Sequence, residues 1–130
     1  MEPQSSRFVI HRHITEPLHF DLMIDQGNTL ATWSFPSHPK NGSPFPLEGK
    51  KIQDHRSQYL EYEGPISKGR GRIEKVDQGP LQILQSSPKN WILEFQGHDL
   101  SGIYVLERQK DSSWKLDRQP TASPHSLNRE

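Results

Sequence analysis

Residues 13–25 read HITEPLHFDLMID, and the second half of this stretch decides the fold class. From Leu18 to Ile24 apolar and polar residues alternate, which is typical of a β-strand with one buried face and one polar face. The polar side chains His19 and Asp21 are two residues apart, so they leave the strand on the same side. The side chains that leave it on the other side can be buried, namely Phe20, Leu22 and Ile24.

The polar face of this strand has the composition of a metal site. His13 lies upstream of His19, far enough along the chain for a bend to bring it to the same point as His19 and Asp21. Two neutral imidazoles and a carboxylate suit a borderline divalent cation such as Mn²⁺ or Zn²⁺, with coordination positions left open for substrate. On spacing alone, the alternative is a set of solvated or hydrogen-bonded histidines on an amphipathic strand.

Composition favours short strands over long helices. The 130 residues suit a single domain, only 30% of them are hydrophobic, and the mean hydropathy is −0.89, so the core is expected to be thin. Nine glycines and 11 prolines indicate many turns. The sequence therefore predicts an all-β fold, a compact antiparallel β-barrel-like single domain with little helix, over residues 1–117. Residues 118–130 lack periodicity and are expected to form a disordered tail.

Nine segments have the pattern of strands. They are residues 7–12, 18–24, 29–35, 50–54, 72–76, 81–85, 91–96, 103–108 and 114–116. Gly79 is expected to mark a turn or bulge between two of them. The three tryptophans are expected to pack in the core or at the barrel ends.

Charge and cysteine content exclude some classes of function. The chain has 16 basic and 16 acidic residues, and the absence of a basic excess argues against extended, non-specific binding to duplex DNA. Recognition of a strand end by a few contacts stays compatible with this balance. There is no cysteine, hence no disulfide and no thiolate metal ligand. No signal peptide or membrane-spanning run is evident, so a soluble, cytoplasmic monomer is expected.

An ordered series of short motifs resembles the 3′-phosphoesterase domain of bacterial and archaeal DNA ligase D. The series covers roughly residues 5–117, and its order is more specific than any single piece. The motifs are FVIHRH (8–13), LHFDL (18–22), WSFP (33–36), QDH (53–55), YEGPI (62–66), DQG (77–79), LSGIYVL (100–106) and WKL (114–116).

The resemblance implies a compact β-barrel that uses a divalent metal, most often Mn²⁺, with Zn²⁺ or Co²⁺ as alternatives. It implies removal of a terminal ribonucleoside and then of a 3′-phosphate from a DNA or RNA strand end during DNA repair. The metal ligands would be His13, His19 and Asp21, while His55 would contact the phosphate beside Tyr59. The chain has no room for a polymerase or ligase segment, so such a partner is expected to act in trans.

The chain also departs from the family pattern. Met23 stands where the family normally has an arginine, on the same strand face as Asp21, and a thioether cannot grip phosphate as a guanidinium does. Replacement cations would come from Lys50, Lys51, Arg70 or Arg72. Two alternatives follow, a non-catalytic metal-containing module that binds a nucleic-acid end or a protein, and a metallo-hydrolase for another phosphoester. His11 shares a face with His13 and is expected to be solvent-exposed.

Overall fold

The computed structural model describes residues 2–119, and nearly all of their regular structure is β-strand. The strands are β1 (Gln4–Ile14), β2 (His19–Asp25), β3 (Thr29–Phe35), β4 (Leu47–Arg56), β5 (Gly64–Pro65), β6 (Arg72–Ser86), β7 (Asn90–Gln96), β8 (Ser101–Arg108) and β9 (Trp114–Arg118). One 3-10 turn, η1 (Ser57–Leu60), follows β4. In this part of the chain no helix is long and apolar enough to cross a membrane. The predicted all-β class is confirmed.

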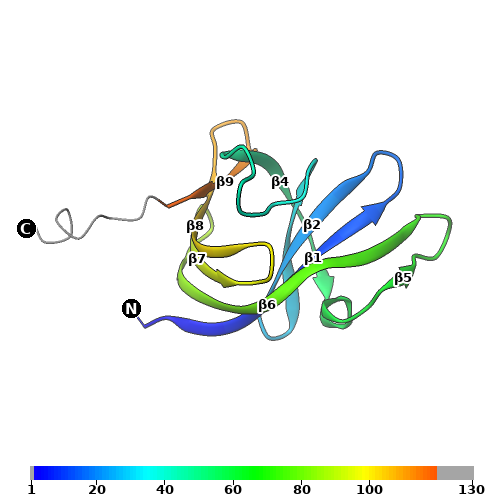
Figure 1. Ribbon diagram of the computed structural model, residues 1–130, viewed down its shortest axis with the longest axis horizontal. Helices are drawn as coiled ribbons and strands as arrows, with labels where there is room; N and C mark the ends of the chain where they lie inside the picture. The colour runs from blue at the N-terminus through cyan, green and yellow to red at the C-terminus, as the bar shows by residue number, and fades with distance from the viewer. Residues whose placement is uncertain (1, 120–130) are drawn as a thin grey trace, which may run out of the picture.

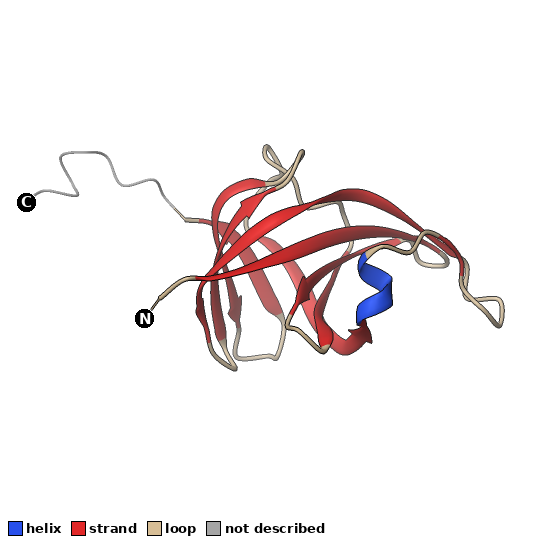
Figure 2. Cartoon of the chain, turned by 90° about the horizontal axis from the view of Figure 1, so that it is seen from below, coloured by secondary structure: helices blue, strands red, loops and turns tan. Residues whose placement is uncertain are grey.

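The strands close into an antiparallel barrel (Figure 1). Neighbours around the barrel follow the order β1-β2-β3-β4-β9-β8-β7-β6, and pairing of β6 with β1 closes the ring. The short β5 pairs with β6 outside this ring. Figure 2 shows η1 lying alongside the strands at one end of the barrel. The predicted barrel is therefore the observed architecture.

One hydrophobic cluster fills the barrel interior, and every strand of the ring contributes to it. Trp33 is fully buried in this cluster, with Trp91 and Trp114 packed edge-on at ring-centroid distances of 5.3 and 5.6 Å. Burying a side chain of the size of leucine or phenylalanine stabilises the fold by roughly 1.5–3 kcal/mol. The tryptophans pack in the core, as expected. Although the chain has few apolar residues, most of those residues lie in or against this cluster.

The first three strands are buried on both faces, which the alternating pattern of β2 does not predict. Residues 8–11, 21–24 and 30–33 are all buried, although alternate side chains point away from the barrel core. A second, smaller cluster covers part of this outer face, formed by Val9, Met23, Leu30 and Leu60 with Tyr59 packed against them. Leu60 and Tyr59 belong to η1, so this short turn is what encloses the outer face.

Two strand predictions merge into one element. Residues 72–76 and 81–85 are parts of the single long strand β6, and Gly79 lies inside it rather than at a turn. A Cβ at Gly79 would lie 2.4 Å from the carbonyl oxygen of Gln96, so a glycine lets β6 pass close to the end of β7. Neither β5 nor η1 is predicted by the sequence pattern. Of the predicted tail, residues 120–130 lie outside the described part of the chain.

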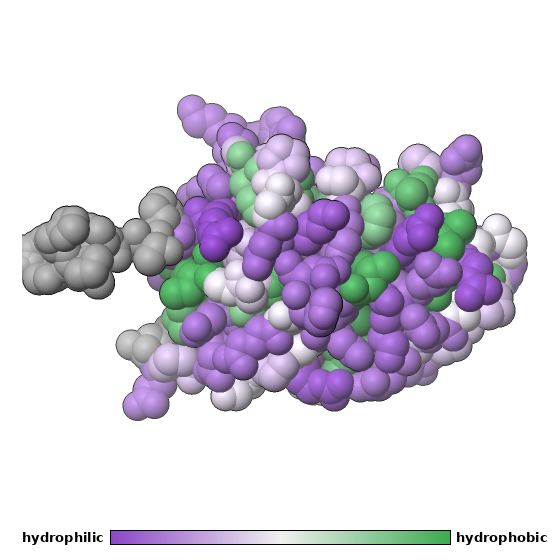
Figure 3. Space-filling view, viewed as in Figure 1, coloured by the Kyte–Doolittle hydropathy of each residue, from purple (hydrophilic) through white to green (hydrophobic). Residues whose placement is uncertain are grey.

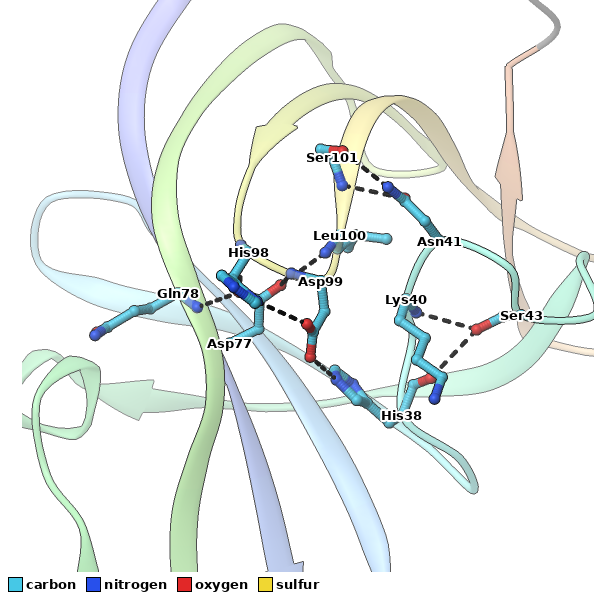
Figure 4. Close-up of polar contacts among 10 residues, drawn as sticks. All are labelled: His38, Lys40, Asn41, Ser43, Asp77, Gln78, His98, Asp99, Leu100 and Ser101. Carbon is cyan, nitrogen blue, oxygen red and sulfur yellow. Dashed lines mark hydrogen bonds and ion pairs between the residues drawn. The ribbon is translucent and has the colours of Figure 1, made fainter.

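A polar network fastens the β7–β8 turn to β6 (Figure 4). The buried carboxylate of Asp77 accepts four backbone hydrogen bonds, from the amides of Gln78 (2.9 Å), His98 (2.7 Å), Asp99 (3.1 Å) and Leu100 (2.8 Å). Asp99 in turn lies 3.0 Å from Nε2 of His38, which belongs to the β3–β4 loop. Every lone pair that Asp77 buries is thus used within the fold.

Candidate metal centre

Pairing of β1 with β2 places four polar side chains in one patch on the outer face. In this register His13 lies opposite His19, and His11 lies opposite Asp21. Directly opposite residues of an antiparallel pair have Cβ atoms about 5 Å apart. The core residues of the same strands, such as Ile10 and Leu22, point to the other side. The strand alternation therefore separates the site from the barrel core.

The three predicted ligands meet at one point. One ligand atom from each of His13, His19 and Asp21 lies within 4.8 Å of the others. Nδ1 of His13 is 3.0 Å from Nε2 of His19, and these nitrogens lie 4.0 and 3.7 Å from the carboxylate oxygens of Asp21. Two nitrogens bound at a right angle to one cation, each at about 2.1 Å, would lie about 3 Å apart. This triad, His13–His19–Asp21, could hold a divalent metal ion.

Backbone carbonyls orient both histidines of the triad. Nε2 of His13 lies 2.8 Å from the carbonyl oxygen of Arg70, and Nδ1 of His19 lies 3.1 Å from that of Pro17. A carbonyl oxygen only accepts hydrogen bonds, so in its neutral form each ring carries its proton on the nitrogen that faces the carbonyl. The other ring nitrogen then has a lone pair. The two lone pairs then face each other beside a carboxylate, an arrangement that a bound cation stabilises. Such outer hydrogen bonds are usual for metal-binding histidines.

Asp21 is buried without a fixed partner for one of its oxygens. Its side chain is 3% exposed, and Oδ1 has no hydrogen-bond partner among the described residues. Burial raises the pKa of this carboxyl, although the nearby His19, His55 and His13 and a hydrogen bond from Ser34 pull it down. An unpartnered buried carboxylate is costly, and a cation would compensate it. The donor set and the unpartnered oxygen both fit a divalent metal.

His11 is buried, contrary to the expectation of an exposed ring. It is 0% exposed, and neither ring nitrogen has a partner among the described residues. Burial, followed by the charge that His55 can carry, lowers the pKa of His11 to about 4, so the ring is neutral at neutral pH. The two-residue spacing from His13 gave its face correctly. That face is not open to solvent at His11, because the ring lines a cavity together with His55 of β4 and Tyr59 of η1.

His55 and Tyr59 reach the same place from elements far along the chain. His55 lies near the end of β4, opposite Leu30, and its Nδ1 is 2.9 Å from the carbonyl oxygen of Gln53. Tyr59 lies in η1 with its ring centroid 6.0 Å from that of His55. Both line a cavity of about 300 Å³ together with His11, His13 and Asp21. The structure thus brings these predicted residues beside the triad.

Two arginines line the cavity, but neither comes from β2, where the family pattern has one. Met23 is 1% exposed and belongs to the small cluster beneath η1, although it also lines the cavity. Arg56 and Arg70 line the cavity as well. Among the four replacement cations expected from the sequence, Arg70 is the one that lines the cavity. Lys51 instead pairs with Asp54 at 3.2 Å, and Lys50 and Arg72 do not line the cavity. Arg56 was not among the sequence candidates.

Comparison with known proteins gives the family. A profile described as the DNA Ligase D 3′-phosphoesterase domain matches residues 11–108. Among curated proteins, the multifunctional non-homologous end joining protein LigD of Pseudomonas aeruginosa is 27% identical over 135 residues, covering 95% of this chain and 16% of that protein. The protein of the same name from Mycolicibacterium smegmatis is 24% identical over 140 residues, covering 95% of this chain and 18% of its own length.

A relative from Mycobacterium bovis with the same name is 25% identical over 118 residues, covering 85% of this chain and 16% of its length. The chain therefore spans less than a fifth of these curated relatives, whose other parts it does not match. The profile covers the triad, the cavity and most of the barrel strands in one continuous match. By this match the chain belongs to the DNA ligase D 3′-phosphoesterase domain family.

Proposed function

We propose that this protein is a divalent-metal-dependent phosphoesterase that acts on the 3′ end of a DNA or RNA strand in DNA end repair. The observation that carries the proposal is the triad, whose three ligand atoms lie within 4.8 Å of one another at the edge of a cavity lined by His55 and two arginines. The family supports the choice of a phosphoester, and the names of the relatives support DNA end joining. Mn²⁺ is the preferred cation, with Zn²⁺ or Co²⁺ as alternatives.

The residues of the cavity divide the work of binding and proton transfer. When bound at the triad, a divalent cation would supply Lewis-acid polarisation of a phosphate oxygen. Nδ1 of His55 donates a hydrogen bond to the carbonyl of Gln53. Nε2 is therefore the nitrogen that exchanges a proton with a phosphate oxygen or the leaving oxygen. Tyr59 lines the same cavity, and its hydroxyl would donate a hydrogen bond to the phosphate.

Arg70 takes the part of the phosphate clamp that Met23 cannot fill. Its guanidinium is held by the backbone oxygen and hydroxyl of Ser67, and its own carbonyl orients His13. The β5–β6 connection thus positions a metal ligand and a phosphate-binding cation with one residue. A guanidinium binds phosphate through two parallel hydrogen bonds, which fixes orientation as well as charge.

A second candidate is a non-catalytic module that binds a metal and a strand end. Met23 favours it, because a buried thioether occupies the strand position that faces the site. In this case the protein would bind 3′-phosphorylated ends and release no product. A ligase or polymerase acting in trans would then use the end that it holds.

The experiment incubates the protein with Mn²⁺ and a primer–template whose 5′-labelled primer ends in a 3′-phosphate or in one ribonucleotide. We expect conversion to a 3′-hydroxyl product, and its loss in His19→Ala. His98→Ala is the matched control, because His98 is an exposed histidine in the β7–β8 turn. A wild-type protein that binds the metal and the labelled end but yields no product at high concentration would reject the phosphoesterase and favour the second candidate.

A further inference from the structure

A second hollow adjoins the triad, and nothing in the proposed chemistry uses it. It has a volume of about 710 Å³ and is lined by residues 17–19, 34–36 and 48–50, with Ile52. We call it the Leu18 groove. His19 lines this groove and also supplies Nε2 to the triad, so the two sites meet at one side chain. A molecule whose phosphate lies at the triad therefore extends naturally into the groove.

The walls of the Leu18 groove are mainly apolar. Pro17, Leu18, Pro36 and Ile52 line it, together with Phe35, which is itself fully buried. Leu18 is 41% exposed, and among the described residues only one other large hydrophobic side chain, Tyr62, is comparably exposed. The protein surface is otherwise largely hydrophilic, with small separate hydrophobic areas on the face shown in Figure 3. Concentrated apolar surface beside a polar site is typical of a place where a ligand binds.

The floor of the groove is shaped by close packing of β4 on β3. A Cβ at Gly49 would lie 2.4 Å from the carbonyl oxygen of Ser34 and 2.6 Å from the ring of Phe35. The glycine therefore allows β4 to lie directly over Phe35. Any larger residue would displace β4 from the strand beside it.

One cation of the groove is free to meet a phosphate. Lys50 lies opposite Ser34, which lies opposite Asp21, so Lys50 is two strands from the triad, a spacing of about 10 Å. Lys50 is exposed and makes no ion pair within residues 2–119. Glu48 is the acidic residue of the lining, two positions earlier on the same strand. Apolar walls with a lysine at this distance match a nucleoside flanked by phosphates.

We propose that the Leu18 groove holds the sugar and base of the nucleotide at the strand end, while the phosphate of that nucleotide lies at the triad and Lys50 meets a neighbouring phosphate. This inference rests on the proposed function and adds the place on the protein where the terminal nucleoside of the strand would lie. The contacts are to the apolar faces of sugar and base, so recognition does not depend on base sequence.

Binding can be followed residue by residue, without turnover, by ¹H–¹⁵N NMR of the full chain with Zn²⁺ as a diamagnetic cation. The probes are thymidine 3′-monophosphate and inorganic phosphate. Both are expected to shift amides near the triad, whereas only the nucleotide shifts those of Leu18, Gly49 and Ile52. Shifts confined to the triad with both probes would overturn the assignment. Groove shifts that appear on raising protein concentration alone would assign the groove to contact between copies of the chain instead.

A pair of variants tests the same point by affinity. Ile52→Ser is expected to weaken binding of the nucleotide roughly tenfold and to leave binding of inorganic phosphate unchanged. Ile103→Ser is the matched control, a half-buried isoleucine on β8 that does not line the groove. Equal affinities in the two variants would reject the groove as the nucleoside site. Product formation without groove shifts would reject this inference alone, and groove shifts without product would reject the phosphoesterase alone.

Discussion

Two buried aspartates of this barrel differ in how their charges are compensated. Asp77 and Asp21 are 4% and 3% exposed. Asp77 accepts hydrogen bonds from four backbone amides, so the fold itself satisfies it. Asp21 has an oxygen without a partner and two histidine nitrogens at 3.7 and 4.0 Å. The hydrogen bonds of the fold satisfy the first carboxylate, whereas the second keeps an oxygen that the metal ion of the proposed function would bind.

The largest effect is expected on activity, from the aspartate of the triad. Asp21→Asn keeps the shape of the side chain but removes a charged ligand, so 3′-end processing should fall at least about a hundredfold. Its free energy of unfolding without metal should stay within about 1 kcal/mol of wild type or rise, because a buried charge is removed. Asp25→Asn on the same strand is the control. A large loss of metal-free stability with intact activity would reverse the roles assigned to the two aspartates.

Asp77→Ala should have the opposite signature. Four backbone amides lose a charged acceptor, so the free energy of unfolding in urea should fall by about 3–5 kcal/mol. Activity per folded molecule should be kept, because Asp77 does not line the cavity. Asp117→Ala, at an exposed position on β9, should change stability little. A stability of Asp77→Ala equal to that of the Asp117 control would remove the structural role of the network.

His11 should make the metal-free protein sensitive to acid. Burial is the main reason that its pKa is lowered from 6.5 to about 4. Between these two pH values the ring is protonated in the unfolded chain but neutral in the folded chain. Stability should therefore fall as the pH drops from about 6.5 to about 4, by roughly 3 kcal/mol from this group. Urea unfolding of His11→Gln in EDTA should lack this component, while Asp21 is present in both proteins. Parallel stability curves for the two proteins would contradict a buried, neutral His11.

The smallest of these effects is expected at Arg70. Arg70→Ala removes the guanidinium but keeps the carbonyl that orients His13, so KM for a 3′-phosphorylated strand should rise about tenfold with metal affinity unchanged. Arg72→Ala, at the first residue of β6, is the control, because Arg72 does not line the cavity. Equal KM values in the two variants would exclude Arg70 from the phosphate clamp.

Local pattern predicts the strands and the face on which the triad lies, whereas the choice of His13, His19 and Asp21 as metal ligands rests on the family resemblance. Alternation in β2 places Leu22 and Ile24 in the core and leaves His19 and Asp21 on the other face, as observed. The spacing of His13 from His19 suits a hairpin, and β1 and β2 form one.

Local pattern does not predict which later segments pack against the outer face of the first three strands. His11 is buried and lines a cavity together with His55 and Tyr59, more than 40 residues later, so periodicity within β1 gives the direction of the ring but not its exposure. Gly79 and Pro80 have the composition of a turn, and only the approach of β7 shows that the strand continues through them. Arg70 was one of several candidate cations, because its direction depends on how the β5–β6 connection folds back onto His13.

Binding of one divalent cation by the triad can be measured by a Mn²⁺ titration followed by electron paramagnetic resonance. The free-ion signal should be lost until one equivalent per chain has been added. In His19→Ala the free-ion signal should appear from the first additions, because less of the added metal is bound, while His98→Ala should behave as wild type. Binding of the same strength and stoichiometry in His19→Ala, or no binding in the wild-type protein, would show that the triad is not a cation site.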